Sequence, residues 1–339
     1  MANYLNFPFD AELFRQAWGQ EPDPVKLALI QSGVLVEDSA IAAQIQNDGN
    51  FYTIPFYDVI TGTEVNYDGA TNITSSETTA DSQSGIVYGR AMGLTARNFV
   101  AELSGSDPFG NIASNVGRVW NKKYQARVIG ILNGVFGITG DADWAIHTKD
   151  ISSTTGTAAK IKENTLNDVM VETLGDNKSK YRVAIMHSNV AKTLEDLQMF
   201  EFWTRTDANG VQRPMNIGTC NGLTVIIDDG VPFAKTGGSG ANKDLFKYTT
   251  YLLGEGVLRT ADGRVDVPAE IVREAMTNGG QDTLVTRIRE TIHPNGFSFT
   301  VPTTGFTQSP TDAQLFSSAN WSRKFNAKAI PMAKLITNG

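Results

Sequence analysis

The sequence predicts an α+β fold in which an extended N-terminal part is followed by one long helix and then by mixed helices and strands. Three observations support this prediction. Strand-like runs flank a polar stretch between residues 50 and 97, apolar residues recur at helical spacing from Pro108 onward, and helical and strand-like segments alternate after residue 140. With 339 residues, 41% of them hydrophobic, the chain can bury a core in one large domain or two ordinary ones.

Residues 1–49 are expected to form an arm of short helices. Asp23-Pro24 supplies an N-cap and a first helical position for a helix over Val25–Gln31, which Gly33 would close. Ser39 is expected to cap a second helix that runs through Ile45.

Residues 50–97 are predicted to form a long two-stranded excursion with a mobile tip. Phe51–Phe56 is aromatic and β-branched, residues 61–85 are rich in Thr, Ser, Gly and Asn, and the chain returns through Ile86–Tyr88. An isolated two-stranded ribbon is marginal in water, so this one is expected to lie on a neighbouring molecule.

A long helix is predicted to begin at Asp107-Pro108. Its apolar face recurs at spacings of three and four residues over about seven turns, and Gly134 and Gly137 are expected to end it. Interior glycines lower helicity by about 1 kcal/mol each relative to alanine, so packing must hold this helix.

The remainder is predicted to alternate. The expected helices are Asn164–Leu174, closed by Gly175, and one capped by Ser188. Strands are expected over Tyr181–His187, Leu223–Ile227, Tyr248–Leu253 and Thr283–Ile292. The pair Asn278-Gly279 is predicted to form the tight turn of a hairpin, because this pair supplies positive φ at both central positions. The flexible Gly/Ser loop Lys235–Lys243 is expected to become ordered only where neighbours crowd it.

Charge is distributed unevenly along the chain. Eight acidic residues and no basic one lie between Leu27 and Gly89: Glu37, Asp38, Asp48, Asp58, Glu64, Asp68, Glu77 and Asp81. The stretch from Arg90 to Val128 reverses the sign, with Arg90, Arg97, Arg118, Lys122, Lys123 and Arg127. A solvated acidic loop beside an ordinary helix is one interpretation, and pairing between copies of the chain is the other.

Composition excludes several functions. The net charge of −7 argues against a protein that binds nucleic acid over its whole surface, because counterion release needs clustered Lys and Arg. Cys220 is the only cysteine, so an intrachain disulfide is impossible. The N-terminus does not resemble a signal peptide, and no apolar run is long enough for a membrane span. These features indicate a protein made in a reducing cytoplasm.

No catalytic or cofactor-binding motif is evident, and no cofactor or metal is expected. His147, His187 and His293 are too scattered for a metal site. Asp141-Ala142-Asp143 opens like a calcium loop but lacks the later glycine and glutamate. Asp228-Asp229 follows a strand and is better explained as a turn than as a metal site.

The order of the elements resembles the major capsid protein of tailed bacteriophages, a fold shared with encapsulins. The matching pieces are the loop Asn50–Tyr88, the helix Pro108–Asn133, the strand and turn Leu223–Pro232, the segment Tyr251–Gly256 and the strand from Arg287 that ends in His-Pro-Asn-Gly-Phe. The resemblance implies an N-terminal arm (1–49), an E-loop (50–89), a P-domain with a spine helix (90–139) and long strands (254–304), an A-domain (140–253), and a C-terminal segment (305–339) returning towards the A-domain.

The resemblance further implies hexamers and pentamers that tile an icosahedral head around double-stranded DNA in a virion assembled in the host cytoplasm. Because the arm reaches the loop within about 50 residues of Met1, scaffolding is expected from a separate protein, beside a portal and decoration proteins. The loop contains no lysine, which excludes the lysine-to-asparagine crosslink of some members. The alternatives are an encapsulin-type compartment, a bacterial surface protein and, weakest, a metal-dependent enzyme.

Candidate inter-subunit contacts follow from these features. Glu64, Asp68 and Glu77 of one subunit are expected to face Arg118, Lys122 or Arg127 of the next, or Arg90 and Arg97 at the loop base. The resemblance also implies that the hairpin turn at Asn278 and Gly279 meets its symmetry mates near a three-fold axis.

Overall fold

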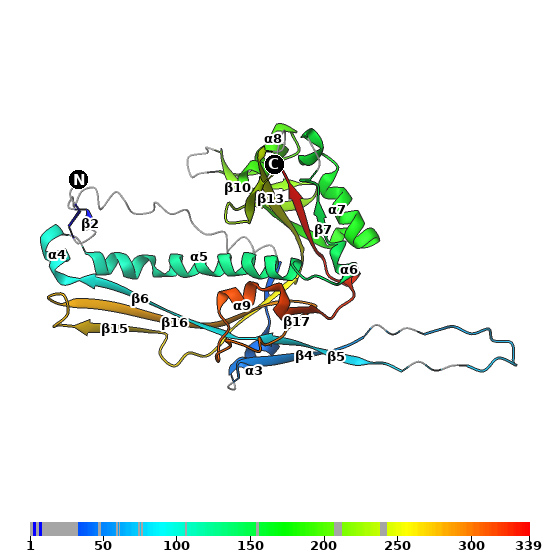
Figure 1. The fold of residues 1–339 in the computed structure, drawn as a ribbon, viewed down its shortest axis with the longest axis horizontal. Coiled ribbons are helices and arrows are strands. Elements are labelled where there is room, and N and C mark those ends of the chain that lie inside the picture. The colour runs from blue at the N-terminus through cyan, green and yellow to red at the C-terminus, as the bar shows by residue number, and fades with distance from the viewer. Residues whose placement is uncertain are drawn as a thin grey trace.

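The chain forms an elongated body, shown by a computed structural model that describes residues 3–4, 7–8, 33–46, 49–58, 60, 62–73, 75, 77–105, 107–153, 156–206, 212–237 and 243–339. A long helix, α5 (Pro108–Phe136), spans the body, and a compact block sits over its C-terminal end (Figure 1). A slender loop projects from the body in the opposite direction from the N-terminal end of α5. The helix expected over Val25–Gln31 and residues 238–242 of the expected Gly/Ser loop lie outside the described residues.

The N-terminal elements are short. Strands β1 (Asn3–Tyr4) and β2 (Phe7–Pro8) pair with each other, and β3 (Leu35–Glu37) runs parallel to β14 (Leu258–Asp262). Helix α3 (Ser39–Gln46) is where the sequence predicts it, but Asp38 caps it, not Ser39. The Asp38 Oδ1 atom accepts hydrogen bonds from the amides of Ala40 at 2.9 Å and Ile41 at 3.3 Å. A carboxylate suits this position because it also faces the positive end of the helix dipole.

The two-stranded excursion is shorter than predicted. Strand β4 (Phe51–Tyr57) pairs with β5 (Ala80–Ile86), and the amide of Val87 donates to the Asn50 carbonyl at 2.8 Å. Strand β6 (Tyr88–Arg97) then leaves this ladder and pairs along its length with β16 (Gln281–Pro294). The prediction that residues 88–97 belong to the excursion is therefore wrong. Their alternating burial fits either sheet, so the sequence could not identify the partner strand.

Strand β16 organises a five-stranded sheet among the described residues, because β6, β14 and β15 (Ala269–Glu274) all pair with it. The predicted Asn-Gly hairpin turn is confirmed between β15 and β16. Asn278 has φ 53° and Gly279 has φ 74°, and the Gly280 amide donates to the Thr277 carbonyl at 2.9 Å. The turn is exposed.

Helix α5 begins where predicted, with the Asp107 carboxylate accepting from the Gly110 amide at 2.9 Å. Gly137 is its C-cap, whereas Gly134 lies inside the helix and does not end it. A Cβ at Gly134 would press on the Phe316 backbone, and one at Gly130 would overlap the Phe316 ring. These glycines let α9 (Asp312–Phe316) pack directly on α5, and this contact offsets part of their low helix propensity.

The compact block is an eight-stranded sheet in the described part of the chain, ordered β7-β19-β13-β8-β11-β10-β9, with β12 beside β13. Its strands are β7 (Thr148–Asp150), β8 (Tyr181–Met186), β9 (Glu201–Thr206), β10 (Gln212–Cys220), β11 (Leu223–Ile227), β12 (Phe233–Gly237), β13 (Lys243–Gly254) and β19 (Met332–Thr337). Because β19 comes from the C-terminal segment, the chain end returns to this block (Figure 1).

Helices flank this sheet. The predicted helix α7 (Thr165–Leu174) ends at Gly175, which has φ 56°. Helix α8 (Ser188–Asp196) is also present, but its N-cap is His187 and not Ser188, because the His187 ring accepts from the Asn189 amide at 3.2 Å. The remaining short elements are α4 (Asn98–Ser104), α6 (Ala142–Ala145), β17 (Phe297–Phe299), β18 (Trp321–Arg323) and the 3-10 turns Gly156–Ala159, Gly175–Lys180, Ser318–Asn320 and Ala327–Ala329.

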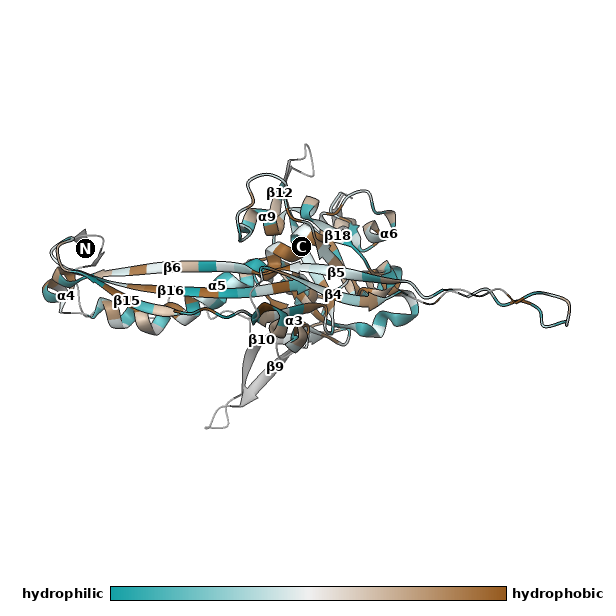
Figure 2. Ribbon diagram, turned by 90° about the horizontal axis from the view of Figure 1, so that it is seen from below, coloured by the Kyte–Doolittle hydropathy of each residue, from teal (hydrophilic) through white to brown (hydrophobic). Residues whose placement is uncertain are grey.

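Two large apolar clusters hold the fold. One joins the C-terminal half of α5 to one face of the eight-stranded sheet through residues such as Ile131, Val135 and Tyr251. The other packs α7 and α8 on the opposite face, around Leu166 and Leu252. The N-terminal half of α5 and strands β6, β16 and β15 extend beyond both clusters as an elongated projection (Figure 2).

Candidate inter-subunit surfaces

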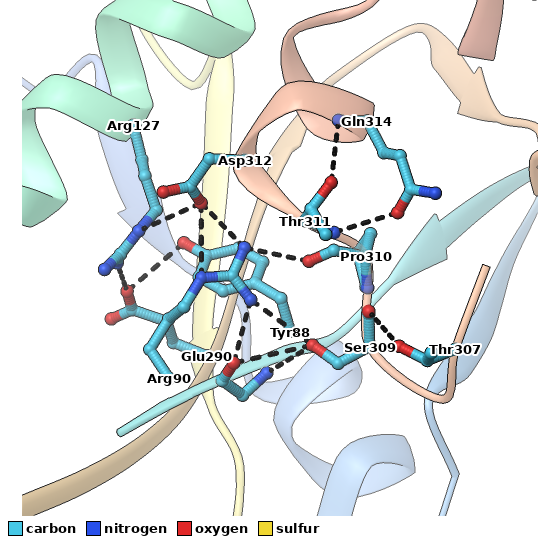
Figure 3. Close-up of polar contacts among 11 residues, drawn as sticks. Tyr88, Arg90, Arg127, Glu290, Thr307, Ser309, Pro310, Thr311, Asp312 and Gln314 are labelled. Atoms are coloured by element: carbon cyan, nitrogen blue, oxygen red, sulfur yellow. Dashed lines mark hydrogen bonds and ion pairs between the residues drawn. The ribbon is translucent and has the colours of Figure 1, made fainter. Parts of the chain in front are cut away.

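A charge cluster lies where α5, β6, β16 and α9 meet (Figure 3). The Arg127 Nη1 atom donates to Glu290 Oε1 at 2.5 Å, and both residues are buried, with 3% and 7% exposed. Asp312 Oδ1 lies 3.7 Å from Arg127 Nε and accepts from Arg90 Nη2 at 2.6 Å. Two cations and two anions therefore neutralise one another inside a single chain.

Tyr88 completes this cluster. Its hydroxyl donates to Glu290 Oε1 at 3.2 Å, and the guanidinium carbons of Arg90 and Arg127 lie 5.1 and 5.3 Å from its ring centre. Burial, followed by the nearby Glu290 charge, raises the pKa of the Tyr88 hydroxyl well above its usual value. The neutral phenol is thus a fixed donor to Glu290 and a partner for both cations.

The same cluster binds the C-terminal segment to the rest of the chain through hydrogen bonds. Arg90 Nη2 donates to the Pro310 carbonyl at 2.8 Å, and the Ser309 Oγ atom accepts from the Gly89 amide at 3.0 Å. Thr311 then starts α9 with a capping box to Gln314. Arg127 and Arg90 were expected to face a neighbouring subunit. In the structure both make intrachain contacts, and their side chains are 4% and 20% exposed.

Helical periodicity contained the signal for the position of Arg127. It lies three residues after Tyr124 and four before Ile131, so it sits within the apolar stripe of α5. An arginine in such a stripe is buried only with a partner, but the partners Glu290 and Asp312 are distant in sequence and could not be identified from it.

The other basic candidates lie closer to solvent. Lys122 is exposed, as is its neighbour Lys123, while Arg118 and Arg97 are half-buried. Arg97 closes the β6 ladder opposite Gln281 near the Asn278-Gly279 hairpin. The exposed basic surface on α5 is thus concentrated at Lys122 and Lys123.

The acidic candidates lie on the projecting loop. Every described residue from Asp58 to Thr79 is exposed except Val65, which is half-buried, and Glu64, Asp68 and Glu77 are among the exposed ones. Asp68 differs from the other two because its carboxylate binds its own tip: Oδ1 accepts from the amides of Ala70 at 2.9 Å and Thr71 at 2.7 Å.

Large apolar side chains on this loop were not assigned a role from sequence. Four of them are 73–93% exposed: Tyr57, Ile60, Tyr67 and Ile73. Their spacing in the sequence is neither helical nor alternating, so periodicity does not predict that they are exposed.

Residues considered for metal or catalytic chemistry have separate structural roles. Asp228 and Asp229 form a turn after β11, where Asp228 accepts from the Gly230 amide at 2.8 Å and Asp229 accepts from the Ser188 amide at 3.0 Å. His147 contacts the Met332 carbonyl and His293 contacts Gln83. In the part of the chain that the structure describes, no three His, Cys, Asp or Glu side chains gather as a metal site would require.

Asp141 caps α6 and also pairs with Arg323, whose Nε donates to Asp141 Oδ2 at 2.6 Å. The Arg323 contact is the main reason the pKa of Asp141 lies below its usual value.

Of the described helices, none combines the length and the apolar character of a membrane-spanning segment.

Comparison with known structures defines the class of this fold. The chain superposes on the capsid of Ralstonia phage GP4 with a TM-score of 0.58 at 12% identity, covering 90% of this chain and 87% of that one. The corresponding values for Mycobacterium phage Che8 are 0.55 at 7% identity, over 99% and 98% of the two chains. The fold is that of the tailed-phage major capsid proteins, with an extended loop, a long helix along a strand arm and a compact α/β block.

Sequence comparison identifies the family. The chain is 30% identical over 306 residues to the major capsid protein of Bacillus phage SPP1, covering 89% of this chain and 88% of that protein. It belongs to the family of phage major capsid proteins, and its function is that of a major capsid protein. No family model matches the sequence.

Proposed function

We propose that copies of this chain form the hexamers and pentamers of an icosahedral head around double-stranded DNA. Residues 50–89 act as the E-loop and residues 140–253 as the A-domain, while residues 90–139 and 254–304 form the P-domain. We assign residues 1–49 to an N-terminal arm and residues 305–339 to a C-terminal segment that returns towards the A-domain. The protein has a structural and non-enzymatic role in the virion and assembles in the host cytoplasm.

The observation that carries this proposal is the projecting loop. Its described residues from Asp58 to Thr79 hydrogen-bond only to one another in the bonds the structure describes, and nearly all are exposed. Figure 1 shows the loop projecting away from the body. About ten residues separate Asp58 from the tip, which gives a reach of roughly 30 Å at about 3.3 Å per extended residue. Such a ribbon is not stable alone in water, so a neighbouring subunit is its natural support.

Charge indicates where the loop lies on that neighbour. Described residues 49–89 carry acidic side chains and no basic one, whereas α5 exposes Lys122 and Lys123. We place Glu64 and Glu77 against this basic surface of the next subunit, with Arg118 and Arg97 as further partners. An exposed pair contributes about 0–1 kcal/mol, but the same pairs recur at every subunit boundary and suppress incorrect registers.

Other partners follow from the same role. We assign scaffolding to a separate protein, and a portal and decoration proteins are expected beside it. The alternative role for Lys122 and Lys123 is to balance DNA phosphates instead of loop carboxylates, without reading sequence, since phosphate contacts carry no base information. We place the exposed Asn278-Gly279 turn near a three-fold axis and the Gly/Ser loop expected over Lys235–Lys243 at the centre of a capsomer.

A charge swap tests the subunit contact. Glu64→Lys with Glu77→Lys should slow shell assembly at low salt, measured by light scattering and electron microscopy, and added salt should reduce the difference from wild type. Combining these changes with Lys122→Glu and Lys123→Glu should restore assembly, while Glu64→Asp with Glu77→Asp serves as the matched control. Assembly of the first variant at the wild-type rate in low salt would refute the electrostatic contact.

A further inference from the structure

The tip of the projecting loop has a defined local structure although it extends into solvent. Asp68 Oδ1 accepts from the amides of Ala70 and Thr71, and Oδ2 accepts from the Thr71 hydroxyl at 2.8 Å. Asn66 Nδ2 donates to the same Oδ2 at 3.4 Å. Gly69, with φ 73°, occupies a left-handed position that favours glycine. The turn over residues 66–71 is therefore held by the Asp68 side chain and needs no residue from the body of the subunit to form.

These hydrogen bonds change what Asp68 does. The Thr71 amide, and next the Ala70 amide, lower the pKa of Asp68 to about 2, so the carboxylate remains a charged acceptor across all working pH values. Both of its oxygens are occupied within the tip. Its main role is thus to shape the turn, whereas Glu64 and Glu77 remain the acidic residues that carry charge to a neighbour.

The turn presents an aromatic side chain. Tyr67 is 93% exposed, and Ile60 and Ile73 on the two loop segments are 73% and 77% exposed. Three large apolar side chains are thus exposed within 14 residues of an otherwise polar loop, and burying any of them against a partner would remove apolar area from water. A tyrosine buries a large apolar ring at low entropic cost and keeps one hydroxyl for a hydrogen bond.

A groove lies beside α5. A cavity of about 380 Å³ is bounded by Trp120, Tyr124 and Pro268 on its apolar walls, with Asp262 among its polar groups. The Trp120 indole donates to Thr286 Oγ1 at 3.0 Å, which fixes that wall. The exposed Lys122 and Lys123 lie in sequence between Asn121 and Tyr124, both of which line the groove. At about 100° per residue, Lys123 points roughly 100° away from Tyr124 around the helix, so the basic surface lies on the flank of α5 next to the groove and a loop drawn to it must cross the helix to reach the groove.

We propose that the loop tip is a preformed anchor, in which Asp68 positions the turn and Tyr67 inserts into the groove beside α5 of a second copy of the chain. This inference rests on the proposed function, since it specifies how the loop is held by its neighbour. Charge brings the loop to α5, and the buried ring then fixes its register. Because the turn exists before docking, little additional ordering is needed at the tip.

Two pairs of variants test the anchor. Tyr67→Ala should raise the protein concentration needed for shell assembly on the order of tenfold, the loss expected for exposing one aromatic ring, while Tyr67→Phe should stay within a few-fold of wild type. Asp68→Ala should act like Tyr67→Ala, and Asp68→Asn, which keeps an acceptor oxygen but loses the charge, should recover most of the assembly. Thermal unfolding of the unassembled subunits should be unchanged in all four.

A photocrosslink tests the partner directly. Benzoyl-phenylalanine in place of Tyr67, in shells assembled from mixed ¹⁴N and ¹⁵N subunits, should crosslink between chains to peptides containing residues 118–124 or 262–268. Crosslinks confined to other peptides or to the same chain, or assembly of Tyr67→Ala at the wild-type concentration, would overturn the anchor. If the wild-type chain assembles into shells but the anchor predictions fail, the proposed capsid role stands and only the anchor is refuted.

Discussion

The buried pair between Arg127 and Glu290 should be the most costly single contact of this subunit to break. Arg127→Met removes the guanidinium that balances the charge of Glu290, a carboxylate that is only 7% exposed and to which the Tyr88 hydroxyl still donates. An uncompensated buried charge costs about 3–5 kcal/mol of the free energy of unfolding. Arg264→Met is the matched control, because its pair with Asp266 has side chains 74% and 82% exposed and should contribute about 0–1 kcal/mol.

The double variant makes this prediction sharper. Arg127→Met with Glu290→Leu removes both charges, so its free energy of unfolding should return to near the wild-type value or exceed it. Urea denaturation of the unassembled subunit, followed by tryptophan fluorescence, measures all four proteins. A loss under 1 kcal/mol for Arg127→Met, or a double variant less stable than the sum of its parts, would refute the burial argument.

Three further outcomes follow from the structure. Gly130→Ala should lower the free energy of unfolding in urea by about 1–3 kcal/mol, because the added Cβ overlaps the Phe316 ring. Gly117→Ala should raise it by up to about 1 kcal/mol, because the added Cβ meets no atom within 4 Å and alanine favours the helix. Burial lowers the pKa of His293 from 6.5 to about 3, so below pH 6.5 the unfolded chain binds a proton at this residue that the folded chain does not. The free energy of unfolding of the wild type should therefore fall by up to about 1.4 kcal/mol per pH unit between pH 6 and pH 5 because of this group. His293→Gln should lack that part of the pH dependence when denaturation is measured at each pH. Gly279→Ala should cost about 1–2 kcal/mol by calorimetry, because φ is positive at this position of the β15–β16 turn.

Local features of the fold were predictable because they depend on residues close in sequence. Asp107-Pro108 fixed the start of α5, Gly175 the end of α7, and Asn278-Gly279 the hairpin turn. The two misassigned caps, at Ser39 and Ser188, lie one residue from the true caps Asp38 and His187. Both pairs of neighbours carry an acceptor, and only the backbone geometry decides between them.

Long-range features were not predictable by the same route. Strand β6 has the alternation expected of either partner, so its pairing with β16, almost 200 residues away, is decided by tertiary packing around Tyr88. Arg90 and Arg127 looked like surface cations because their partners Glu290 and Asp312 come from the far end of the chain. Asp68 looked like a free charge, and its hydrogen bonds to Ala70 and Thr71 depend on the tip conformation.

Cryo-electron microscopy of particles assembled from the purified chain with its scaffolding partner tests the central claim most directly. The reconstruction should show hexamers and pentamers in which residues 58–79 of each subunit lie along α5 of the next. Particles in which this loop folds back on its own subunit, or a chain that forms no closed shell, would contradict the account.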